Sequence, residues 1–315
     1  MSSLRIICLG AGQGWHASEL QIACSHLGHE LTLASYESIR ARVGAGMFDV
    51  HSSAGSFSDY DVVLARTMPS GSFERITFRL AVLHELEFQR SGKKTVLGSP
   101  SGQGRTPLVV NPPRALELAI DKFATLSRVV TLGYQVPETI VAQDRNEALE
   151  AFKQLGGDCV VKPVFGGEGR GVMRVQEEEL AWYAFSTLEQ VDALFYIQKF
   201  YPPGGMDIRL LVIGSRVIGV RRTNPNDFRT NRAGGGKSEA FVVTDDLREL
   251  AINICQDLGL VYGAVDLLEN EHGETKVVEV NAIPGWKGAQ RVTPFSIAEG
   301  IITTVADLAV QGGEG

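Results

Sequence analysis

A glycine-rich stretch between two short apolar runs restricts the fold of this chain most. The sequence at 160–175 reads VVKPVFGGEGRGVMRV and contains Gly166, Gly167, Gly169 and Gly171. Glycine at this density lets a backbone lie close to a ligand, often a phosphate group. Both flanks, CVVKPV and GVMRV, have the pattern of short strands. We therefore predict a hairpin whose tip folds over phosphates, unlike a Walker loop, which joins a strand to a helix.

Two other glycine-rich stretches match nucleotide motifs poorly. GAGQGW at 10–15 lacks the third glycine of the dinucleotide pattern, and no acidic residue ends the next predicted strand. TNRAGGGKS lacks the first glycine of the Walker motif, because Asn231 occupies that position. We interpret the first stretch as a close strand–helix turn or a pocket edge, where Trp15 and His16 are candidates to contact a heteroaromatic acceptor. A dehydrogenase would rest on this stretch alone.

The order of apolar runs predicts an α/β protein whose C-terminal part is α+β. Strand and helix patterns alternate in residues 1–106, which indicates a small unit with a parallel sheet. Residues 107–191 are predicted as a second unit that contains the glycine loop. Residues 192–315 form a predicted third unit with two hairpins, one of them turning at IGS.

Acidic and amide side chains are predicted to meet on the second of these hairpins. In KVVEVNA, a period of two places Glu279 and Asn281 on one face and Val278 and Val280 on the other. The run YGAVDLL is the expected partner strand and carries Asp266 among apolar residues. Carboxylates together with substrate phosphates are the ligands that Mg²⁺ prefers. We therefore predict a metal site at this hairpin.

Composition excludes several classes of protein. A net charge of −7 and a pI near 5.5 argue against nucleic-acid binding through bulk charge. The four cysteines lack metal-ligand spacing, which is typical of reduced thiols in a cytosolic protein. No signal peptide is evident, and no apolar run approaches the ~18 residues of a membrane helix. We expect a cytoplasmic enzyme without a nucleic-acid or membrane partner.

The motifs, taken in their order along the chain, resemble the ATP-grasp superfamily and, within it, the RimK-like amino-acid ligases. The resemblance covers nearly the whole chain and rests on DKFATLSRVVTLGYQVPET, VVKPVFGGEGRGV, YIQKFY, DIRLLVIG, NDFRTNRAGGG and DLL…EVNAIPGWKG. The stretches SGSFERITFRLAVLHELE and VVNPPRALELAIDK are most similar to ligases that add glutamate to tetrahydromethanopterin. The resemblance implies that ATP, with two Mg²⁺ or Mn²⁺ ions, binds between the second and third units.

The resemblance also implies roles for individual residues. The nucleotide-binding candidates are Lys122, Lys162, Gly166, Gly167, Glu168, Gly169, Gly171, Gln198, Lys199, Phe200 and Asp207. The metal-ligand candidates are Asp266, Glu279 and Asn281. The candidates to touch an acceptor carboxylate or acyl phosphate are Arg209, Arg222, Arg229 and Asn231. Lys199 departs from the glutamate of many relatives, so the backbone is expected to supply the adenine contact.

The chemistry implied by the resemblance has two steps. An acceptor carboxylate attacks the γ-phosphate of ATP to give an acyl phosphate and ADP, and an amino group then displaces phosphate to form an amide. The leading hypothesis is a ligase that adds glutamate to a small acceptor such as a reduced pterin. A RimK-type ligase that modifies a protein C-terminus and a nucleotide-binding regulator without catalysis remain as alternatives. A homo-oligomer is left open.

Overall fold

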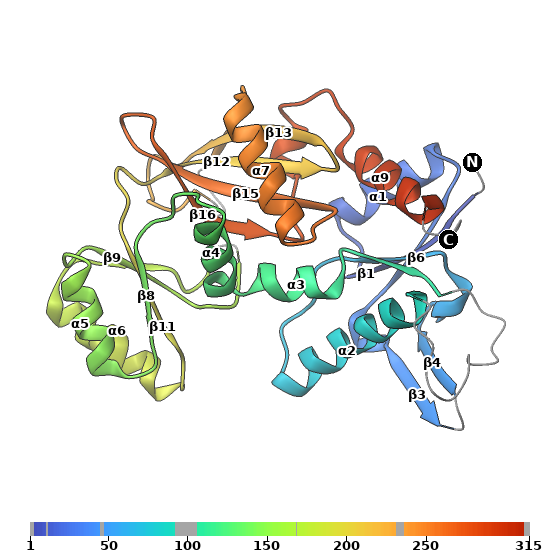
Figure 1. The fold of residues 1–315 in the computed structure, drawn as a ribbon, viewed down its shortest axis with the longest axis horizontal. Helices are drawn as coiled ribbons and strands as arrows, with labels where there is room; N and C mark the ends of the chain where they lie inside the picture. The colour runs from blue at the N-terminus through green and yellow to red at the C-terminus, as the bar shows by residue number, and fades with distance from the viewer. Residues whose placement is uncertain are drawn as a thin grey trace.

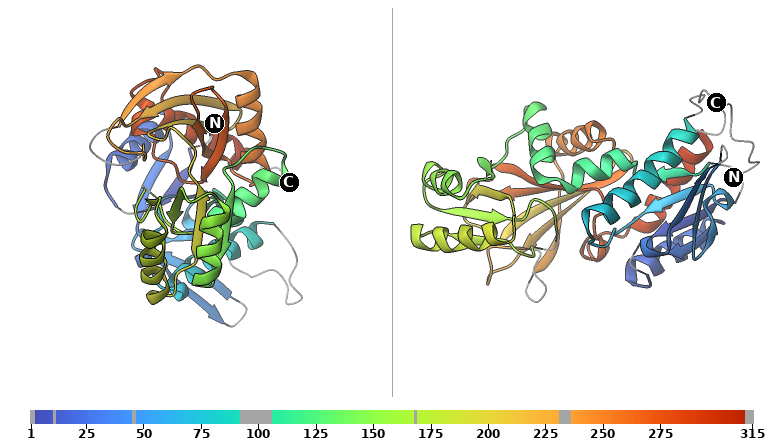
Figure 2. Two further views of the ribbon diagram at one scale, coloured as in Figure 1. Left: turned by 90° about the vertical axis from the view of Figure 1, so that its left-hand side faces the viewer. Right: turned by 90° about the horizontal axis from the view of Figure 1, so that it is seen from below.

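The chain folds into three lobes (Figures 1 and 2). The computed structural model describes residues 3–10, 12–44, 47–91, 106–167, 169–230 and 236–311. Figure 1 shows that the C-terminal helix α9 (Ile297–Gln311) returns to the first lobe and lies beside α1 (Trp15–His26). None of the helices in the described part of the chain is long and apolar enough to cross a membrane.

The first lobe is built on a parallel sheet with the strand order β2-β1-β6-β7. Its strands are β1 (Arg5–Leu9), β2 (Glu30–Ala34), β6 (Val62–Ala65) and β7 (Leu108–Val110). Helices α1 and α9 cover one face, and α2 (Phe73–Arg90) covers the other. The central strands β1 and β6 are therefore largely buried on both faces, as is usual in parallel sheets, whereas the edge strand β2 is partly exposed. This confirms the predicted α/β unit.

A second, small sheet in the first lobe was not predicted. It is antiparallel and joins β3 (Arg40–Gly44), β4 (Met47–Ser52) and β5 (Gly55–Ser56), with short 3₁₀ turns at Tyr36–Ser38 and Phe57–Asp59. All described side chains of β3 are exposed, so no apolar alternation marks this strand in the sequence.

The middle lobe contains an antiparallel sheet with the order β10-β9-β11-β8. Its strands are β8 (Thr139–Ala142), β9 (Cys159–Lys162), β10 (Met173–Val175) and β11 (Phe195–Lys199). Helices α5 (Arg145–Gln154) and α6 (Glu178–Gln190), the latter unpredicted, pack against it. Because β9 pairs with β10, the glycine loop joins two strands as predicted. The sequence assigned β11 to the third unit, whereas its hydrogen bonds join it to the second.

The third lobe contains an antiparallel sheet with the order β14-β13-β12-β15-β16. Its strands are β12 (Met206–Ile213), β13 (Arg216–Thr223), β14 (Lys237–Phe241), β15 (Tyr262–Glu269) and β16 (Thr275–Asn281), and its helices are α7 (Asp245–Asp257) and α8 (Lys287–Gln290). Both predicted hairpins are present. Gly214 has a φ of +57° in the turn between β12 and β13, the left-handed conformation that a two-residue hairpin turn requires.

A helix break places Lys122 at the boundary between lobes. Helix α3 (Pro113–Ile120) begins at a proline, whose missing N–H costs nothing in the first turn. The carboxylate of Asp121 then accepts hydrogen bonds from the N–H groups of Phe123 and Ala124 and caps α4 (Lys122–Thr131). Lys122 is therefore the first residue of a new helix, facing the glycine loop.

Candidate nucleotide and metal site

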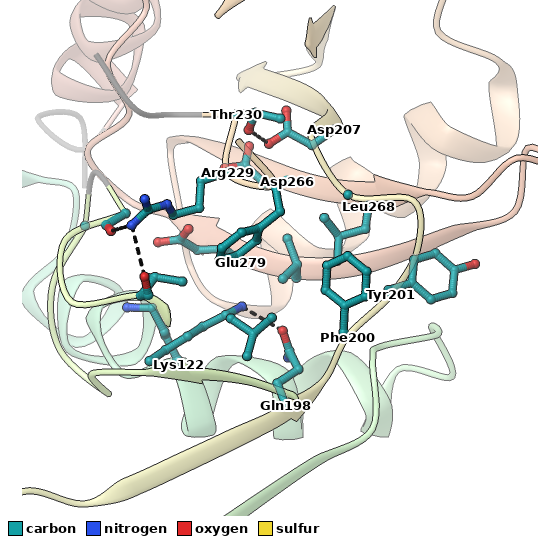
Figure 3. A pocket seen from close by; sticks show the side chains of 18 of the residues that line it. Lys122, Gln198, Phe200, Tyr201, Asp207, Arg229, Thr230, Asp266, Leu268 and Glu279 are labelled. Atoms are coloured by element: carbon teal, nitrogen blue, oxygen red, sulfur yellow. Dashed lines mark hydrogen bonds between the residues drawn. The ribbon is translucent and has the colours of Figure 1, made fainter. Parts of the chain in front are cut away.

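A cavity between the second and third lobes collects most of the predicted nucleotide-site residues (Figure 3). The predicted residues that line it are Lys122, Lys162, Gly166, Gly167, Gly169, Gln198, Lys199, Phe200, Asp207, Arg222, Arg229, Asp266 and Glu279. Gly171, Arg209 and Asn281 lie beside it and are not part of this lining. Glu168 and Asn231 lie outside the described residues.

One end of the cavity is apolar and suits a heteroaromatic base. The rings of Phe200 and Phe228 meet edge to face with centroids 6.3 Å apart, and Leu268 lines the same cavity. The guanidinium of Arg174 lies 3.5 Å from the Phe200 centroid, and Asp158 binds it through both carboxylate oxygens, at 2.8 Å and 2.6 Å. Phe228 and Arg174 were not predicted, since their contacts with Phe200 arise only in the folded chain.

The two predicted lysines approach the cavity from the second lobe. The Nζ atom of Lys162 donates to Oε1 of Gln198 at 2.6 Å. Burial lowers the pKa of Lys162 to about 8, with Glu279 opposing and Lys122 reinforcing the shift. The Nζ atom of Lys122 donates to the carbonyl oxygens of Val164 and Gly166, at 3.3 Å and 2.7 Å, and burial lowers its pKa as well. Two desolvated cations next to a glycine loop favour phosphate binding.

The lowered pKa of Lys162 predicts a pH-dependent affinity for ATP. Only the protonated amine attracts phosphate, and it loses its proton as the pH rises through about 8. We expect the KM for ATP to rise from about pH 7 to about pH 9 in the wild type and to stay nearly constant in Lys162→Arg, because arginine remains charged throughout. Steady-state kinetics across this range test the expectation. An identical rise in both proteins would assign the effect to another group.

A β-bulge shapes the carboxylate face of the third lobe. Asp266 on β15 lies opposite Glu279 on β16, but the next pair is Leu267 with Val277. Val278 therefore has no partner of its own and lines the cavity beside Glu279, while Val277 is buried in the core. The prediction that Val278 lies on the face opposite to Glu279 was wrong, because strict alternation assumed an unbroken strand.

Arginines bind the acidic side chains of this face. Arg209 donates from Nε and Nη2 to the two oxygens of Asp266, at 2.8 Å and 2.6 Å. Arg222 binds both oxygens of Asp207, at 2.6 Å and 2.7 Å, and lies 3.2 Å from Asp266. Burial alone would raise the pKa of Asp266, but Arg209 and Arg222 outweigh it and hold the pKa at about 2. Asp266 is therefore a carboxylate at neutral pH.

Two candidate residues of this face, Arg222 and Asp207, differ in how they relate to the cavity and to their protein partners. Of the neighbours Arg221 and Arg222, only Arg222 lines the cavity, whereas Arg221 binds Glu269 at 2.8 Å. The carboxylate of Asp207 also accepts a hydrogen bond from the Thr230 hydroxyl. Its hydrogen-bonding capacity is thus largely used within the protein, and its role as a nucleotide contact stays a prediction.

The donor set around Glu279 fits a hard divalent cation. Burial and the neighbouring Asp266 raise the pKa of Glu279, while Lys122 and Lys162 oppose the shift. Asn281 donates from Nδ2 to Oδ2 of Asp266 at 3.3 Å. The amide oxygen of Asn281 takes no part in this hydrogen bond and can coordinate a metal ion. Within the described residues no three His, Cys, Asp or Glu side chains are grouped to hold a metal, so the site depends on two carboxylates and one amide. Mg²⁺ suits such a site, because it keeps water and phosphate ligands.

Arg229 connects the third lobe to the glycine loop. Its Nη1 donates to the carbonyl oxygens of Val172 and Gly169, at 3.0 Å and 3.5 Å (Figure 3). Asp227 fixes the guanidinium through Nε and Nη2, at 2.9 Å and 2.8 Å. Lys122 binds the other end of the same loop. The loop is therefore held over the cavity from two sides, and the contact of Arg229 with an acceptor group stays a prediction.

Comparison with known proteins decides the family. A model of the RimK-like ATP-grasp domain matches residues 119–305, which is more than half of the 315 residues. The chain belongs to the RimK-like ATP-grasp family. It is therefore an ATP-grasp ligase, and such ligases use ATP with Mg²⁺. The match includes every described candidate residue for nucleotide and metal binding.

Individual relatives agree with this assignment. A tetrahydromethanopterin:alpha-L-glutamate ligase of Methanococcus maripaludis is 34% identical over 208 residues, which cover 64% of this chain and 70% of the relative. An alpha-aminoadipate–LysW ligase, LysX, of Saccharolobus solfataricus is 32% identical over 205 residues, covering 63% and 74%. The solved ligase PsnB, in complex with a minimal precursor, Mg and ADP, superposes with a TM-score of 0.71 at 20% identity, covering 98% and 99%. This likeness confirms the ATP-grasp fold.

Proposed function

We propose that this ligase joins the amino group of glutamate to a carboxylate of a small acceptor of the reduced-pterin type. One observation carries the proposal: Lys122, Lys162, Asp266 and Glu279 converge on a single cavity under the glycine loop. This arrangement suits phosphoryl transfer from ATP. The proposed substrates are inferred from the relatives that are named tetrahydromethanopterin:alpha-L-glutamate ligases.

Each part of the cavity has a task in the proposed first step. Lys162 and Lys122 neutralise the triphosphate, so that an anionic carboxylate can approach the γ-phosphorus. A carboxylate oxygen of the acceptor forms a bond to this phosphorus, and the bond to the ADP oxygen breaks. Asp266, Glu279 and Asn281 would hold two Mg²⁺ ions, which stabilise negative charge on the transferring group. The glycine loop, held by Lys122 and Arg229, covers the phosphates and excludes water.

The second step needs an amine and a positioned acyl phosphate. The amino nitrogen forms a bond to the acyl carbon, inorganic phosphate leaves with the former carboxylate oxygen, and the amine releases a proton. Arg209, which binds Asp266 beside the cavity, is a proposed contact of the acyl phosphate or the glutamate carboxylates. Arg222 and Arg229 line the cavity and remain proposed contacts. Asn231, which lies outside the described residues, also remains a proposed contact.

Release of ADP tests the proposal directly. The enzyme is incubated with Mg²⁺, ATP, a panel of amino acids and a panel of carboxylate acceptors that includes reduced pterins, and Glu279→Ala serves as the inactive control. We expect ADP only where glutamate and a reduced pterin are both present. If no small acceptor supports release although ATP binds, the acceptor is of another class, such as a protein C-terminus.

A further inference from the structure

The segment 282–286, which reads AIPGW, directly follows Asn281 of the metal-site strand. It contacts the first lobe at the carboxyl ends of three parallel strands, β1, β6 and β7. After each of these strands comes one residue that binds the backbone of the segment: His16, Arg66 and Asn111. Doubly wound sheets usually bind their ligands at this edge. Here the indole of Trp286, which is fully buried, occupies the position.

The contacts from the first lobe fix the segment at several points. The buried Asn111 donates to the Ala282 carbonyl at 2.7 Å. Arg66 donates to the Pro284 carbonyl at 3.3 Å, and its guanidinium lies 4.6 Å from the Trp286 ring. The Nε2 atom of His16 accepts a hydrogen bond from the backbone N–H of Trp286 at 3.1 Å.

The protonation state of His16 agrees with its role as an acceptor. Burial, together with the positive charges of Arg66 and Lys287, lowers the pKa of His16 to about 4. The imidazole is therefore neutral at physiological pH, and Nε2 keeps the lone pair that the Trp286 N–H requires.

The opposite side of the segment reaches the metal site. The carbonyl of Gly285 accepts a hydrogen bond from Nη1 of Arg209 at 3.3 Å. The Nε and Nη2 atoms of the same guanidinium donate to the two oxygens of Asp266. Contacts therefore run without a break from His16 and Arg66, through Pro284, Gly285 and Trp286, to Arg209 and Asp266.

We propose that His16 and Arg66 are positioning residues for the metal site: they hold segment 282–286 so that Arg209 and Asn281 orient the ligand Asp266. The inference rests on the proposed metal site. It adds to that site residues of the first lobe, which contributes no residue to the described cavity lining. It also assigns a role to the GAGQGW turn at 10–15, which leads directly into His16. The turn then serves to place His16 against Trp286 and not to bind a dinucleotide. Partners that orient a metal ligand from outside the coordination sphere typically affect metal affinity and activity about 10–100-fold.

The test compares two histidines that make the same kind of bond. His29 is buried in the first lobe, where its Nδ1 accepts the Leu4 N–H at 3.2 Å, and it has no contact with segment 282–286 among the hydrogen bonds of the described residues. His16→Phe and His29→Phe therefore each leave one backbone N–H without its imidazole acceptor. We expect His16→Phe to raise the Mg²⁺ concentration needed for ADP binding, measured by calorimetry, about tenfold. His29→Phe should lower the melting temperature and leave the Mg²⁺ dependence unchanged.

A second pair of variants keeps the test decisive if His16→Phe does not fold. In His16→Gln the amide oxygen can take the place of Nε2, whereas in His16→Asn it is one bond too short. We expect the wild-type Mg²⁺ dependence in His16→Gln and a weakened one in His16→Asn. Equal Mg²⁺ dependence within each pair would overturn the inference. Because ADP binding needs no acceptor, failure of the proposed ligase reaction would appear separately, as absent turnover with intact Mg²⁺-dependent binding.

Discussion

Replacing Glu279 with alanine is expected to lower ADP release about a thousandfold, with the fold retained. Glu279 lies directly opposite Asp266 and lines the same cavity as Lys122 and Lys162. Without it, the proposed metal ions lose a carboxylate ligand, and negative charge on the transferring phosphoryl group is less well stabilised. Because burial and Asp266 raise the pKa of Glu279, the charged side chain is costly to the fold, so its removal should not lower the melting temperature.

Glu271→Ala is the matched control, because Glu271 is exposed in the turn of the same hairpin. It changes the net charge by the same amount and should keep wild-type turnover. Steady-state kinetics and thermal melts of both variants complete the comparison. Retention of most activity by Glu279→Ala would rule out Glu279 as an essential metal ligand.

The substitution Arg209→Met is expected to lower both turnover and the free energy of unfolding. The substitution removes the guanidinium that binds both oxygens of Asp266 and the Gly285 carbonyl. Breaking one side of a buried ion pair costs about 3–5 kcal/mol of unfolding free energy, and Arg222, which also lies near Asp266, should keep the loss near the lower end. We expect turnover to fall about a hundredfold, the usual range for one lost charge-stabilising group. Urea unfolding and kcat provide the two measurements.

Arg221→Met provides the comparison for Arg209→Met on the same sheet. Arg221 also binds a carboxylate with both interactions below 3.1 Å, that of Glu269, but it does not line the cavity. Its side chain is 36% exposed, against 17% for Arg209, so its ion pair is better solvated and should contribute less. Turnover should therefore persist in Arg221→Met. Similar kinetic losses in both variants would show that Arg209 acts only through the stability of the sheet.

Local patterns explain why much of the fold and site was predictable. The flanking strands of the glycine loop, Lys162 at the end of β9, and the Asp266 and Glu279 positions all follow from short apolar periods. The family resemblance then supplied roles for these residues, and the RimK-like family model confirms the family. Roles of individual side chains remain predictions.

Contacts between distant parts of the chain were not predictable in the same way. Arg229 donates to the glycine loop, some sixty positions earlier in the sequence, a contact that no local pattern indicated. Its contact with an acceptor stays a prediction. The bond between His16 and Trp286 joins residues 270 positions apart. The bulge at Val278 and the pairing of β11 with β9 likewise depend on which strands meet, a choice that tertiary packing makes.

The most direct test of the central claim follows one oxygen atom through the reaction. An accepted substrate is prepared with isotopically heavy oxygen in its reacting carboxylate, and the phosphate released during amide formation is examined by mass spectrometry. Transfer through an acyl phosphate predicts one heavy oxygen in each released phosphate, together with one ADP for each amide formed. Unlabelled phosphate, or AMP and pyrophosphate in place of ADP, would contradict the account.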